Sequence, residues 1–382
     1  MNSDFLGYLS GKTIISRDTS FIFNLIRAIA AELVLISHLF DYSRNPAPKI
    51  TLFENIQIGN VSSLMGRIGV VLFFIISGIL ISNSIFSKLG SKNYCFKSYF
   101  IDRFARIFSG LVPALLFIAV IDGLHLFIFP DNYHSFDMAL HVNATYSIVS
   151  FIASLFMVSN FPIGFLNILA FGSGLMLWTV VYEWWLYLMF GWLVINFRQY
   201  YTNTYRFLII LGCFSVYPLA GLLFEKQVSS LIMIWFVGVL ITSLLLSAKD
   251  HNIGNKPEFL YLGLFFGILA LMYGYNFKEL YDLTPELLLA IAVFFVVLNY
   301  LQTEKMNNRT ITSFVRFEAD YSYSLYLVHI PVIILVSAFN LGNFYIIFIA
   351  GYAGSHLVAI IMAYFTEMRH KQVAAWIKQR ML

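Results

Sequence analysis

An arginine and a histidine, Arg27 and His38, lie eleven residues apart inside the first long apolar segment, residues 21–40. In an α-helix this spacing brings both side chains to within about 20° of one face, about 16 Å apart along the axis. Ionisable groups inside a membrane helix are costly and usually face a protein interior or a water-filled cavity. Because histidine suits general base catalysis near neutral pH, the pair predicts acid–base chemistry or an ion relay, unless it is purely structural.

Two further arginines, Arg103 and Arg106, are three residues apart and are therefore neighbours on one helical face. Guanidinium groups bind phosphate oxygens bidentately, so this pair is a candidate site for a phosphate-bearing ligand. The alternative is that both residues only anchor the chain against anionic lipids. The spacing leaves both interpretations open.

Polar residues also interrupt two later apolar segments. Ser77 and Gly78 are small residues of the kind that allow membrane helices to approach closely, which favours a packing role. Glu183 lies among several tryptophans. A carboxylate in such surroundings pairs with a cation, carries a proton or orients an imidazole.

The segment that begins near residue 321 carries Tyr326 and His329 on one helical face, which fits either a satisfied core histidine or a polar site. Glu32 and Glu367 are candidates for ion pairs. One group of acids and histidines matches no metal-ligand spacing and is interpreted as a solvated loop, so no metal site is predicted. Its members are Asp122, His125, Asp131, His134, Asp137 and His141.

The composition places these residues in a membrane. The chain of 382 residues is 59% hydrophobic and only 12% charged, and its mean hydropathy is +0.78. Soluble domains are nearer 45–50% apolar and about 25% charged. The basic residues are scattered at segment ends rather than clustered on one face, so no nucleic-acid partner is predicted. Cys95 and Cys213 lie in distant segments and predict neither a disulfide nor a zinc site.

The hydropathy pattern predicts an all-α, polytopic transmembrane helix bundle with about ten full spans and a short re-entrant helix at 147–160. The predicted spans are 21–40, 67–86, 108–129, 176–197, 207–224, 230–247, 258–275, 285–301, 321–339 and 344–366. Lysines and arginines concentrate on one side, which predicts that both termini are cytoplasmic. The predicted parts are a cytoplasmic segment 1–20, a transmembrane domain 21–366 and a basic cytoplasmic tail 367–382.

Five motifs occur in order along the chain. They are Arg27 and His38; Phe73, Phe74, Ser77 and Gly78; Arg103 and Arg106; Trp178, Thr179, Glu183 and Tyr187; and the stretch Ser322 to Pro331 with Tyr326 and His329. With these motifs the chain resembles the acyltransferase-3 family of integral membrane acyltransferases, which O-acylate bacterial glycans and related acceptors. It departs from the family pattern at Ser109 and after Glu367, where family members often have a proline. The resemblance therefore implies less about the geometry of the cytoplasmic ends of these two segments.

The resemblance implies transfer of an acyl group, most often acetyl from acetyl-CoA, to a hydroxyl of a cell-surface or lipid-linked glycan at the bacterial inner membrane. It implies that His38 is the general base or a transient acyl carrier, and that Arg103 and Arg106 bind CoA phosphates. The implied catalytic residues are His38, Arg27 and Glu183, and the supporting polar residues are Ser77, Tyr326 and His329. The implied partners are membrane lipids, acyl-CoA and the saccharide acceptor, with a homo-oligomer possible.

Two other classes of function remain open. A transporter or flippase would use the buried Arg, Glu and His residues as an ion relay and would show inverted repeats, of which the sequence has no convincing example. A non-catalytic partner in a membrane assembly would use the same residues only to hold helices together, and its pathway would tolerate replacement of His38.

Overall fold

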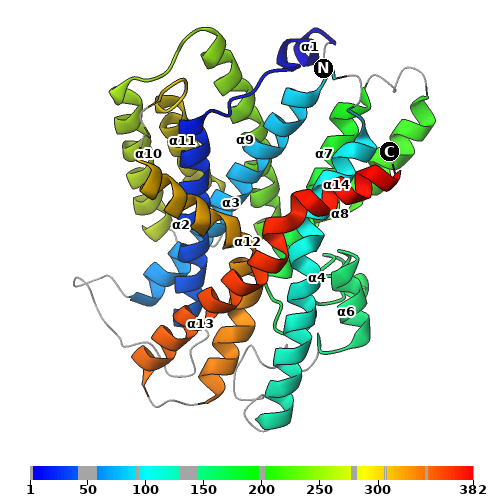
Figure 1. Cartoon of the computed structure of the whole chain (residues 1–382), viewed down its shortest axis with the longest axis vertical. Helices are drawn as coiled ribbons and strands as arrows, with labels where there is room; N and C mark the ends of the chain where they lie inside the picture. Colours follow the sequence, from blue (N-terminus) through cyan, green and yellow to red (C-terminus); the bar gives the residue numbers. More distant parts are fainter. Residues whose placement is uncertain are drawn as a thin grey trace. The chain divides into compact units, whose positions relative to one another are not determined.

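The computed structural model describes residues 3–41, 58–91, 94–129, 145–197, 203–276, 282–304, 306, 308–339 and 343–381. These residues form helices and connecting segments (Figure 1) and contain no β-strand. The chain divides into two compact units. Unit 1 comprises Met1–Ala30, Val70–Phe100 and Trp185–Ala319, and unit 2 comprises Ala31–Gly69, Ile101–Trp184 and Asp320–Leu382.

Nine of the described helices are long and apolar enough to cross a membrane, by length and composition. The predicted all-helical membrane fold is therefore confirmed. The elements in chain order are α1 (Ser3–Leu9), α2 (Arg17–Asp41), α3 (Ile58–Lys88), α4 (Phe96–Ile128), α6 (Ile148–Leu155), η2 (Gly164–Leu166), α7 (Leu177–Ile195), α8 (Thr204–Phe224), α9 (Lys226–Asp250), α10 (Pro257–Asn276), α11 (Leu283–Asn299), α12 (Arg309–Ala338), α13 (Phe344–Phe365), η4 (Glu367–Arg369) and α14 (His370–Met381).

The ten predicted spans each coincide largely with one helix, but several helices are longer than the apolar window. Helix α4 begins at Phe96 rather than at 108, and α12 begins at Arg309 rather than at 321. A hydropathy window detects only the apolar part of a helix, whereas backbone hydrogen bonding continues into polar turns. Helix α11 has 17 residues and is the shortest of the ten.

The segment predicted to re-enter the membrane contains α6, which has 8 residues. A helix of this length rises about 12 Å and is too short to cross a hydrocarbon core of about 30 Å. The basic tail contains a further helix, α14, which the apolar pattern did not predict.

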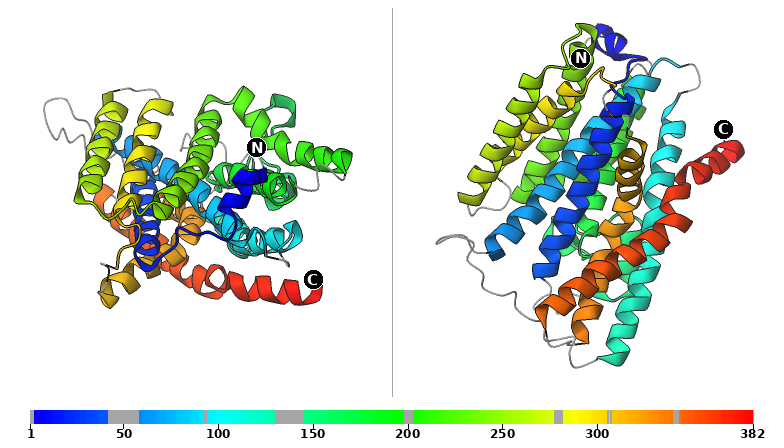
Figure 2. Two further views of the ribbon diagram at one scale, coloured as in Figure 1. Left: turned by 90° about the horizontal axis from the view of Figure 1, so that it is seen from above. Right: turned by 60° about the vertical axis from the view of Figure 1, so that its left-hand side comes forward.

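Two glycines allow α3 and α9 to approach closely in unit 1. A Cβ atom added at Gly78 would overlap the backbone carbonyl oxygen of Trp235, and one added at Gly238 would overlap the backbone of α3. On the following turn, Ser82 Oγ lies 2.8 Å from Thr242 Oγ1. Close backbone approach and a hydrogen bond between small polar residues are the usual means of joining helices in a membrane. The predicted packing role of Gly78 is thereby confirmed. In the same unit, α11 packs against both α9 and α10 (Figure 2).

We expect Gly78→Ala to destabilise the protein by about 1–3 kcal/mol, because the added methyl group meets backbone atoms that cannot move independently. The control is Gly212→Ala on α8, where an added Cβ has no atom within 4 Å. That change should be neutral or stabilising by up to about 1 kcal/mol, through helix propensity alone. Thermal unfolding of the purified variants in detergent measures both effects. Equal unfolding temperatures would contradict the helix crossing.

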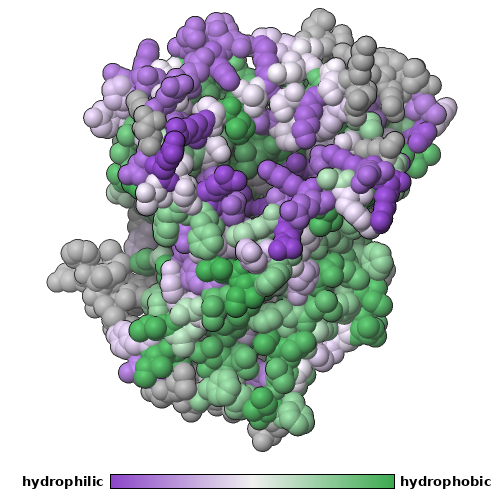
Figure 3. Space-filling model, in the orientation of Figure 1, coloured by the Kyte–Doolittle hydropathy of each residue, from purple (hydrophilic) through white to green (hydrophobic). Residues whose placement is uncertain are grey.

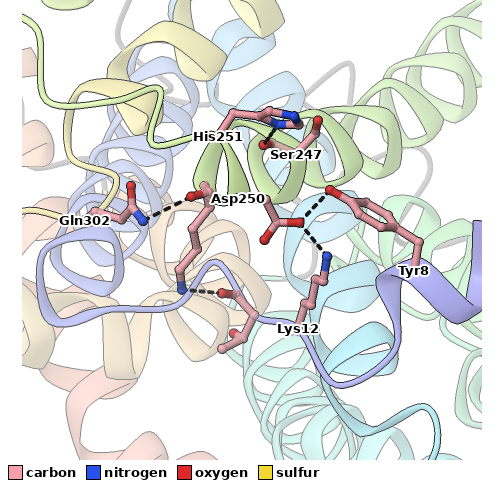
Figure 4. A network of polar contacts seen from close by, with 8 residues as sticks. Tyr8, Lys12, Ser247, Asp250, His251 and Gln302 are labelled. Carbon is pink, nitrogen blue, oxygen red and sulfur yellow. Dashed lines mark hydrogen bonds and ion pairs between the residues drawn. The ribbon is translucent and has the colours of Figure 1, made fainter.

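The N-terminal segment 8–13 forms hydrogen bonds and an ion pair with the C-terminal end of α9 in unit 1 (Figure 4). The Tyr8 hydroxyl donates to Asp250 over 2.5 Å, and Lys12 forms an ion pair with the same carboxylate. This contact raises the pKa of Lys12 above its ordinary value, chiefly through the hydrogen bond from Lys12 to Asp250. Lys249 Nζ donates to the carbonyl oxygen of Thr13 over 2.7 Å. Because exposed ion pairs stabilise little, these contacts mainly orient the segment.

In unit 2, the visible face of α13 is largely apolar, whereas α14 is hydrophilic (Figure 3). The large exposed apolar side chains of α13 are Tyr345, Ile346, Ile349, Tyr352, Leu357, Ile361, Tyr364 and Phe365. Helix α14 packs through Ala374 and Ile377 against Ala105 of α4, and Lys378 Nζ lies 2.6 Å from a carboxylate oxygen of Asp102. These contacts hold the arginine-bearing first part of α4 against the C-terminal helix.

Candidate active site

Two histidines from distant parts of the sequence are in direct contact in unit 2. His38 Nδ1 lies 2.8 Å from His329 Nε2, and the two rings meet edge to edge, with centroids 5.0 Å apart and planes 16° from parallel. His329 has only 1% of its surface exposed, whereas His38 is partly buried. The fold thus joins two residues that the sequence places in separate membrane segments.

The local structure of α12 holds His329 in this position. Its Nδ1 lies 3.0 Å from the carbonyl oxygen of Leu325, four residues earlier in the same helix. Pro331 lies two residues further on within α12. Proline has no N–H, so the helix lacks one backbone hydrogen bond next to the histidine. The backbone contact and the neighbouring proline both fall within the predicted motif.

Tyr326 lies beside His329 in the site. Its ring centroid is 6.1 Å from that of His329, and its hydroxyl lies 2.8 Å from Thr179 Oγ1 at the start of α7. The Thr179 hydroxyl donates its one hydrogen to the carbonyl oxygen of Met176 over 2.9 Å, so the Tyr326 hydroxyl is the donor in their contact. Tyr326 is therefore held between α7 and the buried histidine.

A partly buried ion pair lies beside Ser324 of α12. Arg106 Nη1 is 2.9 Å from Glu367 Oε1, and the exposed fractions of the two side chains are 26% and 0%. Glu367 Oε2 also accepts hydrogen bonds from the backbone N–H of Ser324 over 2.9 Å and from its hydroxyl over 2.8 Å. The prediction that Glu367 forms an ion pair is confirmed. One carboxylate thus connects α4, α12 and η4.

Tyr323 is a member of this region that the sequence analysis did not assign to the site. Its hydroxyl donates to the carbonyl oxygen of Ile107 over 3.3 Å, and the next residue, Ser324, donates to Glu367. Tyr323 lies three residues before Tyr326 on one helical face, and that spacing was the available signal.

Two of the predicted residues, Arg27 and Ser77, fall in unit 1. Arg27 is partly buried on α2, which is continuous over Arg17–Asp41 and therefore carries His38 as well, as predicted. Ser77 Oγ lies 2.8 Å from the Tyr187 hydroxyl and accepts a hydrogen bond from Trp235 Nε1 over 3.0 Å. Unit 2 contains the other six, which are His38, Glu183, Arg103, Arg106, Tyr326 and His329.

The interpretation of Asp122 and His125 as part of a solvated loop was wrong. Both lie on α4, with 2% and 1% of their surfaces exposed. Asp122 accepts hydrogen bonds from the backbone N–H and the hydroxyl of Ser173, over 2.6 and 2.7 Å. These donors compensate the carboxylate for its lost hydration, which explains how it is tolerated inside the fold. The other members of the group, residues 131, 134, 137 and 141, lie outside the described residues.

Glu32, the second candidate for an ion pair, contacts α13 in unit 2. Its Oε1 lies 3.3 Å from His356 Nε2, and its Oε2 accepts a hydrogen bond from the Tyr352 hydroxyl over 3.0 Å. Tyr321 on α12 lies 3.1 Å from the other ring nitrogen of His356. Unit 2 therefore contains a second cluster of polar side chains, formed around Glu32 and His356. Two helices, α2 and α12, contribute to both this cluster and the histidine pair.

Comparison with known proteins adds independent support to the sequence motifs. A family model described as an acyltransferase domain matches residues 21–364. An O-acetyl transferase of Shigella phage Sf6 is 30% identical over 207 residues, which are 54% of this chain and 54% of the relative. The chain thus matches about half the length of this curated relative. No solved structure shows a significant match.

The matched range contains both histidines of the pair and both arginines of α4. It also contains all five sequence motifs, from Arg27 to Pro331. A match over nearly the whole chain shows that this protein belongs to the acyltransferase-3 family of membrane acyltransferases.

Proposed function

We propose that this protein is an integral membrane O-acyltransferase that moves an acetyl group from acetyl-CoA to a hydroxyl of a cell-surface or lipid-linked glycan. The observation that carries the proposal is the contact between His38 and His329, because an imidazole ring that is oriented by a hydrogen bond at one nitrogen can accept a proton at the other. Family membership supports acyl transfer, and the name of the phage relative supports acetyl as the group transferred to oxygen.

In the proposed reaction, His38 takes the proton of the acceptor hydroxyl as the hydroxyl oxygen attacks the thioester carbonyl carbon. The tetrahedral intermediate then collapses, the carbon–sulfur bond breaks, and the CoA thiolate leaves and takes up the proton. A positioned base contributes about 10²- to 10⁴-fold to such a rate. Arg27 and Glu183 hold substrate or stabilise charge. A transient acyl group on His38 is the alternative route.

Donor binding is assigned to the arginine pair of α4. Arg103 and Arg106 would bind the CoA phosphates at the cytoplasmic end of the bundle, with both termini cytoplasmic and the protein in the bacterial inner membrane. The contact with Glu367 orients the Arg106 guanidinium. A well-oriented guanidinium suits bidentate contact with a phosphate, and Arg103, three residues earlier on the same helical face, adds a second positive charge.

The direct test compares surface glycans by mass spectrometry from cells that carry the gene and cells that lack it. We expect loss of the gene to remove acetyl groups from one glycan, and membranes that contain the protein to release CoA from acetyl-CoA. Unchanged acetylation combined with impaired export of the glycan would favour a transporter and overturn the proposal.

We expect Arg103→Lys to weaken CoA binding by about tenfold or more, because lysine keeps the charge but lacks the planar fork that matches phosphate. Calorimetry with CoA and the purified protein measures this affinity. The control is Arg380→Lys on α14, where the guanidinium stacks over Trp376 at 3.9 Å and CoA affinity should not change. If Arg103 only anchors the chain to lipid, lysine will replace it without loss of affinity.

A further inference from the structure

The hydrogen bonds of the histidine pair determine which ring nitrogens carry hydrogen. His329 Nδ1 lies 3.0 Å from the carbonyl oxygen of Leu325. A carbonyl oxygen only accepts, so Nδ1 of His329 is the donor. In a neutral imidazole one nitrogen donates and the other accepts. His329 Nε2 is therefore the acceptor.

The same reasoning assigns the hydrogen of His38, whose Nδ1 lies 2.8 Å from His329 Nε2. Because His329 Nε2 accepts, His38 Nδ1 must donate. Nδ1 of His38 then carries hydrogen, and its Nε2 carries the lone pair in the neutral ring. The geometry thus assigns one tautomer to each ring, starting from a single backbone carbonyl group.

From this arrangement we infer that His329 is a positioning residue for His38, which it holds in the tautomer that reacts through Nε2. The inference rests on the proposed function of His38 in acyl transfer. When His38 takes a proton at Nε2, both of its nitrogens become donors, and the hydrogen bond to His329 is retained. His329 keeps the same tautomer throughout, so the pair needs no rearrangement during the reaction.

The burial of His329 explains why a neutral ring fits this role. Serine hydrolases use a carboxylate to orient the catalytic histidine, and the wrong tautomer costs them about 10⁴-fold in rate. A carboxylate at a position with 1% exposure would need several hydrogen bonds to offset its lost hydration. A neutral imidazole supplies the acceptor without a buried net charge, and one backbone carbonyl satisfies its donor.

The first test is spectroscopic and needs no activity. Solid-state NMR of protein labelled with ¹⁵N-histidine in lipid distinguishes Nδ1–H from Nε2–H rings, and the signal lost in His38→Gln identifies His38. We expect the Nδ1–H form for His38 and His329, although a free neutral imidazole favours Nε2–H. In His329→Leu, His38 should revert to the Nε2–H form. An Nε2–H ring at His38 in the wild-type protein would overturn the inference.

The second test is rescue by a conservative variant. In His329→Gln, the amide oxygen can replace Nε2 as the acceptor, whereas His329→Leu fills similar space without one. We expect kcat for CoA release from acetyl-CoA by membrane vesicles to fall by about 10²- to 10³-fold with leucine but less than tenfold with glutamine, with KM little changed. If both variants are equally stable and lose the same fraction of kcat, His329 only packs against His38 and does not position it.

Failure of this inference is distinguishable from failure of the proposed function. If wild-type vesicles release no CoA and the glycan stays unmodified, acyl transfer is wrong whatever the tautomer. If transfer occurs but His38 carries its hydrogen on Nε2, only the role of His329 is wrong.

Discussion

Replacing His38 with alanine is expected to lower the rate of acyl transfer by about 10²- to 10⁴-fold, while the protein still inserts and accumulates in the membrane. The change removes the proposed base and leaves His329 without the ring that it contacts at 2.8 Å. Acetylation of the surface glycan and release of CoA by membrane vesicles measure the loss. Immunoblotting of the membrane fraction shows whether the variant accumulates.

The matched control is His251→Ala. His251 is exposed at the end of α9, where its Nδ1 lies 2.8 Å from the carbonyl oxygen of Ser247. This contact resembles that of His329 with its own helix, but it lies outside the proposed site, so activity should stay at the wild-type level. Normal acetylation by His38→Ala would remove His38 from the mechanism and favour the role of an assembly partner.

The second large effect is expected at the ion pair between Arg106 and Glu367. Arg106→Gln leaves a carboxylate with 0% exposure without its cation, and loss of one partner of a buried pair costs about 3–5 kcal/mol. Glu367→Gln should cost less, because the arginine that remains is 26% exposed and partly hydrated. Thermal unfolding of the purified variants measures this asymmetry.

The double variant Arg106→Gln/Glu367→Gln separates folding from donor binding. It should recover much of the stability lost in Arg106→Gln, because no unpaired buried charge remains, yet it should still bind CoA weakly. The control pair is Lys378 and Asp102, which are 2.6 Å apart but 29% and 20% exposed. Lys378→Gln should cost less than about 1 kcal/mol. If Arg106→Gln costs no more than Lys378→Gln, the carboxylate is not dependent on Arg106.

The class of fold follows from the sequence because the bilayer leaves few choices. Long apolar segments must satisfy their backbone groups internally, so they become helices. The polar ends of those helices were harder to predict. The first twelve residues of α4 and the whole of α14 lack a continuous apolar run, and α14 packs through only a small apolar contact around Ala105 and Ala374. Both stretches are nevertheless helical, because helix formation does not require the continuous apolar run that a hydropathy window detects.

The sequence by itself also determined which polar residues share a helix. Helical periodicity relates Arg27 to His38, Arg103 to Arg106, and Tyr326 to His329, because residues on one helix have a fixed rotation and rise. It likewise marked Glu32 and Glu367 as charges that need partners. It did not indicate the burial of Asp122, whose compensating donors come from Ser173, 51 residues away.

Only the tertiary structure decided which helices bring their polar residues together. His38 contacts His329 across 291 positions of sequence, and Glu367 pairs with Arg106 rather than with a nearer cation. Membrane helices present similar apolar surfaces to one another and to lipid, so periodicity does not specify their neighbours. That choice depends on close packing and on interhelical hydrogen bonds, which form only between side chains that the complete fold places in contact.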